Sequence, residues 1–394
     1  MLKRRHALQR LAAGAAASLS FPALAQVERQ ILLGQSAALS GPAAQLGLQL
    51  NSGARIFFDR LNAEGGINGR TVQLRALDDG YEPERCRANT ETLINKDGVF
   101  ALFGYVGTPT SVAALPLANA AGVPFFGAFT GAEVLREPFS RWVFHVRASY
   151  YDETELIVRQ LTTLGLKRIA VFRQNDSYGQ AGLDGVVRAL KSRDLAPTAV
   201  GLVERNSVDV AAAVKAIVAD SPDAVVQISA YKSCAAFVRA ARRAGYGGTF
   251  YNVSFVGTKA LADELGKEAL GVVVSQVMPF PFSTTTAIAR EYLEAVRKAS
   301  AGGVGAGVVG GVAGGAVGIT PNYSSMEGYI CAKVFTEGLR RSGSGTSREA
   351  LVTALESMQR YDTGGYMVSF GPRNRRGSSF VELSMLSGDG KVRR

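Results

Sequence analysis

Hydrophobic residues recur along the chain in two alternating patterns, which predict strands followed by helices. Short apolar runs such as 31–36 and 99–103 are typical of buried strands, whereas apolar residues recur at helical spacing over 43–61. Because the two patterns alternate, we expect parallel sheets covered by helices on both faces. The predicted strands of the first part lie at 31–36, 72–77, 99–103 and 123–126, and its helices at 43–61, 83–95 and 109–121.

The same order repeats further along the chain, so the sequence predicts two α/β lobes. Helices at 152–164, 179–193, 208–218 and 233–244 alternate with strands at 168–172, 198–203, 224–228, 250–253 and 272–277. Further helices are expected at 284–300, 323–342 and 346–357, and final strands at 367–370 and 380–386. We expect the chain to cross between the lobes near 144–149 and 275–279. A length of 394 residues also suits two lobes better than one core.

Two segments fall outside this alternation. Residues 1–25 begin with basic side chains, continue in an Ala/Leu-rich run and end in Ala-Leu-Ala, which predicts an export signal cleaved near Ala25. Arg4 and Arg5 leave the twin-arginine and the general export routes both open. Residues 301–318 are almost only Gly, Ala and Val. We expect a flexible insertion there rather than a nucleotide-binding loop, because a charged helix and not a strand precedes it.

Charge and cysteine content exclude several classes of protein. The formal net charge of +11 falls to near +7 without the four basic residues of the export signal. No basic block follows, so we expect no nucleic-acid partner. Cys86, Cys234 and Cys331 lack metal-ligand spacing and are expected to be small buried groups, with a single bridge as the alternative. No second apolar run has membrane-spanning length, so we expect the exported protein to be soluble.

Enzyme motifs are missing from the sequence as well. After the export signal His145 is the single histidine, and its apolar setting in WVFHVR is typical of a structural side chain. Asp78 and Asp79 are consecutive, so they point to opposite faces of a strand. We expect them to end that strand and hold the turn at 80–81. No nucleophile elbow, phosphate loop or zinc motif is found, so we expect no catalytic residue, no metal and no cofactor.

The candidate binding site begins at 103–111, FGYVGTPTS, where a strand runs into a turn rich in hydroxyl groups. Thr108 and Pro109 are typical of a helix N-cap and its first turn. The free amides and the dipole of such a helix end favour a carboxylate, and Gly107 lets it approach. Thr110 and Ser111 add hydroxyl donors. Since ligands of α/β sheets bind at the carboxyl ends of strands, we predict that this turn holds the acidic head of a small ligand.

Further candidates follow other strands. The turn at 126–132, FGAFTGA, contains Ala128 and Thr130. In the second lobe, Tyr151 follows the crossover, and Tyr178 and Tyr231 open helices directly after strands. Tyrosines at several strand ends are typical of an apolar wall with hydroxyl tips. We therefore expect these residues to face the same ligand.

Seven stretches in a specific order carry a resemblance to a known family. They are LSGPAAQLG (39–47), NAEGGINGR (62–70), DDGYEP (78–83), FGYVGTPT (103–110), GVPFF (122–126), NDSYGQAGL (175–183) and NYSSMEGYICAK (322–333). The chain resembles the periplasmic solute-binding proteins of ABC importers, in the branched-chain amino acid (leucine/isoleucine/valine-binding) group. The resemblance implies a type I periplasmic binding protein, with two Rossmann-like lobes and three hinge crossings that close over a small ligand. The first lobe is expected at 26–147 plus 279–358, and the second at 148–278 plus 359–394.

The resemblance also implies roles for several of the candidates. By residue match, Thr108 and Thr130 would take the ligand carboxylate with help from the backbone around them. Tyr178 and Tyr231 match second-lobe aromatic residues that close over the ligand.

Two positions depart from the family pattern. One is Leu46, where an aromatic residue often follows G-P-x-x-x. Where amino acid binders carry an acid for the ligand's ammonium group, this chain has Ser254. Losing that acid favours an amine-free ligand, such as an organic or aromatic acid. Asp152 or Glu153 is the alternative source of the charge, so an amino acid stays open as the ligand.

The expected function is a periplasmic receptor, not an enzyme, that delivers a small carboxylate-bearing solute to the membrane permease of an ABC transporter. We expect it to act as a monomer. A ligand-sensing module for a signalling receptor is the main alternative. An enzyme using the same cleft is a third, against which the lack of a nucleophile–histidine pair argues.

Overall fold

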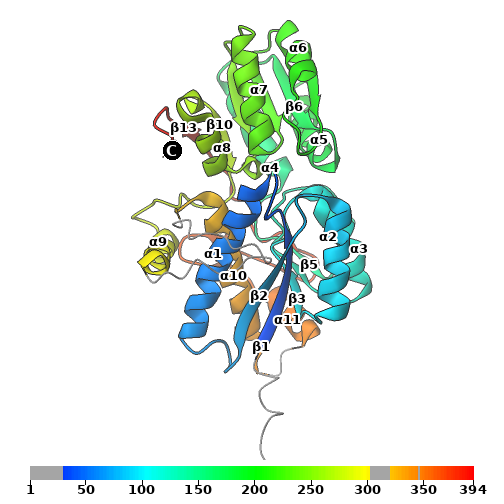
Figure 1. Ribbon diagram of the computed structural model, residues 1–394, viewed down its shortest axis with the longest axis vertical. Coiled ribbons are helices and arrows are strands. Elements are labelled where there is room, and N and C mark those ends of the chain that lie inside the picture. Colours follow the sequence, from blue (N-terminus) through cyan, green and yellow to red (C-terminus); the bar gives the residue numbers. More distant parts are fainter. Residues whose placement is uncertain (1–29, 302–319, 345–346) are drawn as a thin grey trace, which may run out of the picture.

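The computed structural model describes residues 30–301, 320–344 and 347–394, which form two α/β lobes stacked along the long axis (Figure 1). The predicted export signal at 1–25 lies outside the described residues. So does the predicted insertion at 301–318, apart from its first residue, which ends helix α9.

The first lobe is built on a five-stranded parallel sheet with the order β2-β1-β3-β4-β5. Strand β1 lies between β2 and β3 and places Leu33 between Leu74 on one side and Ala101 on the other. The strands are β1 Gln30–Ala37, β2 Thr71–Asp78, β3 Ala101–Phe103, β4 Phe125–Phe126 and β5 Val143–Phe144.

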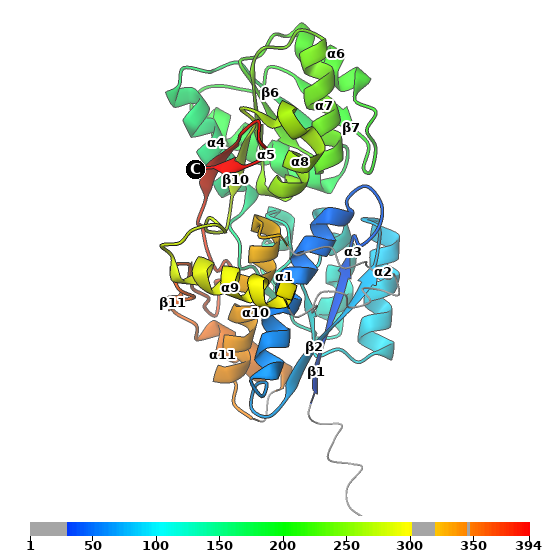
Figure 2. The same cartoon turned by 60° about the vertical axis from the view of Figure 1, so that its left-hand side comes forward.

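Helices cover both faces of this sheet, because successive strand side chains point to opposite sides. Leu102 packs in the apolar cluster under α2 and α3, whereas Phe103 packs in the cluster under α1 and α10. Figures 1 and 2 show these two pairs of helices on either side of the sheet. The helices of the lobe are α1 Ala44–Ala63, α2 Pro83–Glu91, α3 Thr108–Ala120, α9 Ala287–Ala301, α10 Tyr323–Arg341 and α11 Arg348–Glu356.

The second lobe has a seven-stranded sheet with the order β14-β13-β10-β9-β8-β6-β7. Its core strands run parallel, and β13 and β14 are antiparallel additions at one edge. The strands are β6 Ile169–Gln174, β7 Val200–Val203, β8 Ala224–Ile228, β9 Thr249–Asn252, β10 Val273–Gln276, β13 Glu382–Leu386 and β14 Val392–Arg393. The helices are α4 Tyr150–Thr163, α5 Ser177–Lys191, α6 Ala211–Ala219, α7 Tyr231–Arg243 and α8 Thr258–Leu265.

The predicted alternation of strands and helices is confirmed, with differences at some element ends. The predicted helix at 83–95 ends as an α-helix at Glu91 and continues as a π-helical turn, Thr92–Lys96. The predicted strand at 367–370 joins neither main sheet: β12 Met367–Val368 pairs only with β11 Tyr361–Asp362. Short 3₁₀ turns lie at Glu133–Leu135, Ser254–Val256 and Gly266–Ala269.

The first two crossings between the lobes follow β5 and β10. Strand β5 ends in the first sheet at Phe144, and α4 of the second lobe begins at Tyr150. Strand β10 ends in the second sheet at Gln276, and the next residues, Val277 and Met278, pack in the core of the first lobe.

The third crossing comes later than expected, which corrects the predicted boundary at 358–359. Tyr366, Val368 and Phe370 are buried in the core of the first lobe, and the Phe370 ring meets the Phe144 ring edge-on, 5.3 Å between centroids. The chain joins the second sheet only at β13. The apolar pattern of this segment suits either lobe, and only its packing against Phe144 decides between them.

Three smaller predictions about single residues are confirmed. All three cysteines are free and buried. His145 is buried with Nε2 3.0 Å from the Leu135 carbonyl oxygen, and burial lowers its pKa well below the usual value, as expected of a structural histidine. The Asp78 and Asp79 carboxylates accept hydrogen bonds from the Gly80 and Tyr81 amides, at 2.9 and 2.8 Å, and so hold the turn after β2.

Two searches over the described residues bear on membranes and metals. Among their helices, none combines the length and the apolar character that crossing a membrane requires. No group of three or more His, Cys, Asp and Glu side chains in the described ranges is placed to hold a metal ion.

Helices α1 and α10 approach so closely that glycine is required between them. A Cβ atom at Gly53 would lie 1.8 Å from the Ser325 carbonyl oxygen, which is far inside van der Waals contact. We expect Gly53→Ala to lower the free energy of unfolding by about 1–3 kcal/mol, because backbone must move to admit the methyl group. Thermal unfolding of the purified protein measures the change. The control is Gly247→Ala, where no atom lies within 4 Å of an added Cβ; equal melting temperatures of the two variants would contradict the prediction.

Candidate functional site

The two turns that the sequence singled out lie side by side between the lobes. An isolated parallel bridge joins Val106 to Phe129 and extends the pairing of β3 with β4 beyond the strand ends. As a result, the Thr108 and Thr130 hydroxyl oxygens are 2.7 Å apart, and Thr130 donates on to the Tyr150 hydroxyl at 3.2 Å. All three side chains are buried. The structure thus gathers a chain of hydroxyl groups at the carboxyl ends of β3 and β4.

Helix α3 begins at this hydroxyl chain, and its N-terminus has no side-chain cap. Thr108 is therefore not the N-cap that the sequence predicted; Gly107 is, because its left-handed φ of 97° starts the helix one residue earlier. A Cβ atom at Gly107 would lie 2.2 Å from the Tyr81 ring, so only glycine fits there. Within the described residues, the amides of Thr108 and Thr110 have no hydrogen-bond acceptor. The buried Ser111 hydroxyl has no hydrogen-bond partner there either.

An aromatic cluster from both lobes covers this helix end. The Phe255 ring of the second lobe lies between first-lobe Phe129 and second-lobe Tyr178, with centroid distances of 5.5 and 4.6 Å. Tyr81 and Tyr150 complete the cluster, at 5.8 Å from Phe255 and 5.5 Å from Tyr178 respectively. The hydroxyl of Tyr178 is buried without a hydrogen-bond partner in the described structure. The region between the lobes is therefore apolar, with a few buried polar groups.

A buried ion cluster centred on Arg147 joins the lobes at the hinge. Arg147 is 1% exposed and lies 3.8 Å from Glu153 of α4 and 3.6 Å from Glu327 of α10. Its guanidinium also stacks on the Phe129 ring, 4.9 Å from the centroid, and donates to the Ser254 hydroxyl. Burial lowers the pKa of Arg147, but the two glutamates outweigh it and raise that pKa, so Arg147 stays charged.

Glu153 stands beside Ser254, the position where the family pattern expects an acid. Its carboxylate accepts from the Ser254 amide at 2.7 Å, from the Ser254 hydroxyl at 3.0 Å and from the Ser275 hydroxyl at 2.6 Å. Of the two alternative acids that the sequence left open, Glu153 is thus the one beside Ser254. Asp152 instead caps its own helix, bonding to Ser149.

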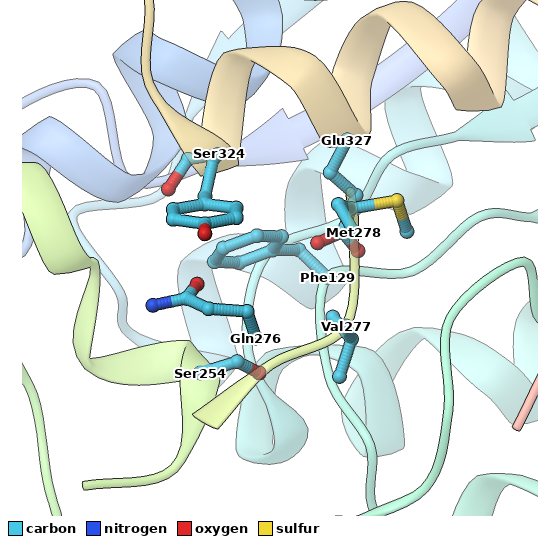
Figure 3. A pocket seen from close by; sticks show the side chains of 8 residues that line it. Phe129, Ser254, Gln276, Val277, Met278, Ser324 and Glu327 are labelled. Carbon is cyan, nitrogen blue, oxygen red and sulfur yellow. The ribbon is translucent and has the colours of Figure 1, made fainter. Parts of the chain in front are cut away.

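A small cavity opens next to this cluster, and we call it the hinge cavity (Figure 3). It is lined by Phe129, Ser254, Gln276, Val277, Met278, Tyr323, Ser324 and Glu327. The cavity has room for about one water molecule in this closed arrangement of the lobes. Figure 3 shows the Glu327 carboxylate pointing from α10 toward Phe129 and the segment that carries Val277 and Met278.

The remaining predicted site residues differ in whether they face the region between the lobes. Ala128 is buried beside Thr130, whereas the Thr110 hydroxyl turns back to the Val106 and Gly107 carbonyl oxygens. Tyr231 reaches across the lobe boundary to the backbone of Gln45. Tyr151 points away: it lies half-buried under Arg188 on α5, 5.1 Å from the guanidinium carbon. Its neighbour Tyr150 lies in the aromatic cluster instead; the helix begins at Tyr150, two residues earlier than predicted.

Sequence reasoning missed Arg147, Glu327 and Phe255. Charged residues are usually solvated, so a lone arginine after a strand and a glutamate within a helix gave no signal of burial. Phe255 follows Ser254 in a short 3₁₀ turn, where an apolar side chain has many possible environments. Only the contact between the lobes identifies all three.

A second set of contacts closes the lobes at the edge away from the hinge residues. Arg205 donates to Glu82 at 2.9 Å, and Asn206 donates to the same carboxylate at 2.8 Å. Deeper inside, the Gln174 amide donates to the Tyr81 hydroxyl at 3.3 Å. The lobes therefore meet through polar contacts on both sides of the aromatic cluster.

The fold and this interlobe site define a two-lobed binding protein, and the chain belongs to the family of periplasmic binding proteins, whose sequence pattern matches residues 30–390. It is of the leucine/isoleucine/valine-binding type, as the resemblance implied. This assignment and the α/β fold with Rossmann-like lobes are confirmed by comparison with known proteins.

Particular relatives span almost the full chain. The crystal structure of a possible leucine/isoleucine/valine-binding protein from Rhodopirellula baltica SH 1 is 34% identical, covers 93% of this chain and 96% of that one, and superposes with a TM-score of 0.84. A substrate-binding periplasmic protein from Ralstonia solanacearum is 33% identical, with coverage of 92% and 99% and a TM-score of 0.83. Leu/Ile/Val-binding protein homolog 8 of Brucella suis biovar 1 is 24% identical over 409 residues, 98% of this chain and 95% of that protein. By their names, these relatives are binding proteins rather than enzymes.

Two buried acids, Glu327 of the ion cluster and Asp79 of the turn after β2, predict how the stability of the protein depends on pH. Burial raises the pKa of Glu327 from 4.5 to about 7, and that of Asp79 from 3.8 to about 6. The folded protein keeps these protons at pH values where the unfolded chain has lost them, so the free energy of unfolding falls as pH rises from about 4.5 to about 7. Glu327→Gln removes one contribution. We therefore expect the difference in free energy of unfolding, variant minus wild type, to rise by on the order of 2–3 kcal/mol between pH 5 and pH 8.

Thermal unfolding over a pH series checks this prediction. The matched control is Glu337→Gln on the same helix, whose carboxylate pairs with Arg341 at 2.8 Å outside the ion cluster. Its unfolding should follow the wild-type pH profile. Identical pH profiles for Glu327→Gln and wild type would show that Glu327 titrates as in the unfolded chain.

Proposed function

We propose that this protein captures a small carboxylate-bearing solute, an amino acid or an amine-free organic or aromatic acid, between its two lobes and delivers it to the membrane permease of an ABC transporter. The observation that carries the proposal is the group of buried donors at the N-terminus of α3. They are the Thr108 and Thr110 amides and the unpartnered Ser111 hydroxyl. The Thr108 and Thr130 hydroxyl groups lie beside them and can rotate from their own hydrogen bonds toward a ligand.

These donors suit an anion for two physical reasons. A helix N-terminus carries a partial positive charge, and a carboxylate oxygen accepts from uncapped first-turn amides. Helix α3 has no acidic residue in its first turn, and no side chain competes for these amides. Helix α5, whose N-terminus faces it from the second lobe, differs: the Asp176 carboxylate already accepts from the Tyr178 and Gly179 amides. An anion is therefore favoured at α3 rather than at α5.

Lobe closure then explains how binding is made selective. The aromatic cluster around Phe255 and Tyr178 excludes water, which strengthens each hydrogen bond to the bound carboxylate. Contacts such as Arg205 with Glu82 form only when the lobes are close. A permease that recognises the closed form would thus receive only the occupied receptor.

The hydroxyl of Thr108 offers the most direct test. Thr108→Val keeps the shape of the side chain but removes a donor from the carboxylate site. We expect the dissociation constant for a bound carboxylate to rise roughly tenfold or more, as measured by isothermal titration calorimetry. The ligand is first found by a thermal-shift screen of carboxylates and amino acids.

The control is Thr162→Val on α4, whose hydroxyl donates only to its own helix backbone. That variant should bind as wild type does. An unchanged affinity of Thr108→Val would refute the carboxylate site at α3.

A further inference from the structure

The hinge cavity contains two buried polar side chains that have no hydrogen-bond partner in the described structure. Glu327 is 3% exposed, and its nearest cation, Arg147, lies 3.6 Å away, outside hydrogen-bond distance. Ser324 is 4% exposed, and its hydroxyl makes no hydrogen bond within the described residues. Burying polar groups in this way is costly unless a partner satisfies them.

The other polar groups of the cavity are already occupied by protein partners. The Gln276 amide donates to the Thr258 and Ser384 hydroxyl groups, at 2.8 and 2.7 Å. The Ser254 hydroxyl donates to Glu153 and accepts from Arg147. Glu327 and Ser324 are thus the groups that remain for a bound molecule.

Size and charge restrict what these two groups can bind. The cavity holds about one water-sized group, which is too small for a second carboxylate. At a pH above its pKa of about 7, the Glu327 carboxylate would also repel a second carboxylate bound beside it. Glu327 accepts hydrogen bonds, so the complementary group is a small donor.

The cavity lies beside one of the two turns of the proposed carboxylate site. Phe129 and Ser254 line it, and Phe129 immediately precedes Thr130 of the hydroxyl chain. Phe129 therefore borders both the hinge cavity and the turn of Thr130.

We propose that the hinge cavity is a second subsite of the ligand, in which Glu327 and Ser324 bind a hydrogen-bond-donating group, an ammonium or a hydroxyl. This inference rests on the proposed function and narrows it to carboxylates that carry such a donor. It disfavours simple monocarboxylates and dicarboxylates. A site built to bond a donor discriminates strongly against an analogue without it, because its own buried groups then stay unpaired.

Matched probes test the proposal by isothermal titration calorimetry on the wild-type protein. One set is 4-methylpentanoate with its 2-hydroxy, 2-amino and 2-oxo derivatives; a second is phenylacetate, mandelate and phenylglycine. In a set that binds, we expect the hydroxyl or amino member to bind at least tenfold more tightly than the parent acid, and the oxo acid to resemble the parent. Equal affinities within the set would overturn the inference and leave the carboxylate site intact. Binding of no probe in either set would count against the proposed carboxylate function, and the inference would fall with it.

Two variants test separately how Glu327 and Ser324 contribute to binding the donor group of the ligand. Glu327→Gln should remove at least tenfold of the preference for the amino probe, because the charge is lost, and less of the preference for the hydroxyl probe, because the amide oxygen still accepts. Ser324→Ala should weaken the preferred probe alone. Glu337→Gln on the same helix is the control and should keep every preference. If Glu327→Gln does not fold, Ser324→Ala and the wild-type probe series still decide. A uniform loss across all probes would contradict a donor subsite, whereas that is the result expected of Thr108→Val.

Discussion

The buried positive charge of Arg147 constrains how the two lobes meet. A guanidinium at 1% exposure is unfavourable unless anionic partners surround it, and here Glu153 comes from α4 and Glu327 from α10. These partners belong to different lobes, so the ion cluster is complete only when the lobes are in contact. The Phe129 ring beneath the guanidinium then sets the place of the turn that carries Thr130. The hinge and the proposed binding site thus depend on the same arginine.

The site between the lobes has two chemically different ends. The α3 end offers amides and hydroxyl groups, and the hinge end offers the Glu327 carboxylate. Phe129 lines the hinge cavity and packs against Phe255 of the aromatic cluster that covers the α3 end. Such an arrangement suits a small polar molecule with its charge at one end, because each end attracts a different group. The departure from the family pattern at Ser254 belongs to this arrangement, since its hydroxyl and amide are bonded to Glu153.

Much of the candidate site could be predicted from the sequence as local chemistry. The glycine and hydroxyl residues after two neighbouring strands marked the turns that contain Thr108 and Thr130, and parallel strands bring such turns together. Tyr178 opens its helix as expected. The N-cap was misplaced by one residue, because a left-handed glycine and a threonine are both acceptable there. Tyr151 was chosen in place of Tyr150 for a similar reason: consecutive residues of a helix point about 100° apart, and the start of the helix decides which one faces the site.

The sequence by itself determined the strand and helix order, the two-lobed α/β class and the turns at the strand ends, because these follow from periodicity and from the conformational needs of a few residues. Tertiary structure alone decided that Arg147, Glu153 and Glu327 share one buried cluster, and that the segment around Phe370 packs on the first lobe. The reason is physical: these outcomes depend on contacts between residues far apart in the chain, and the free energy of burying a charge or a ring is set by what lies opposite it.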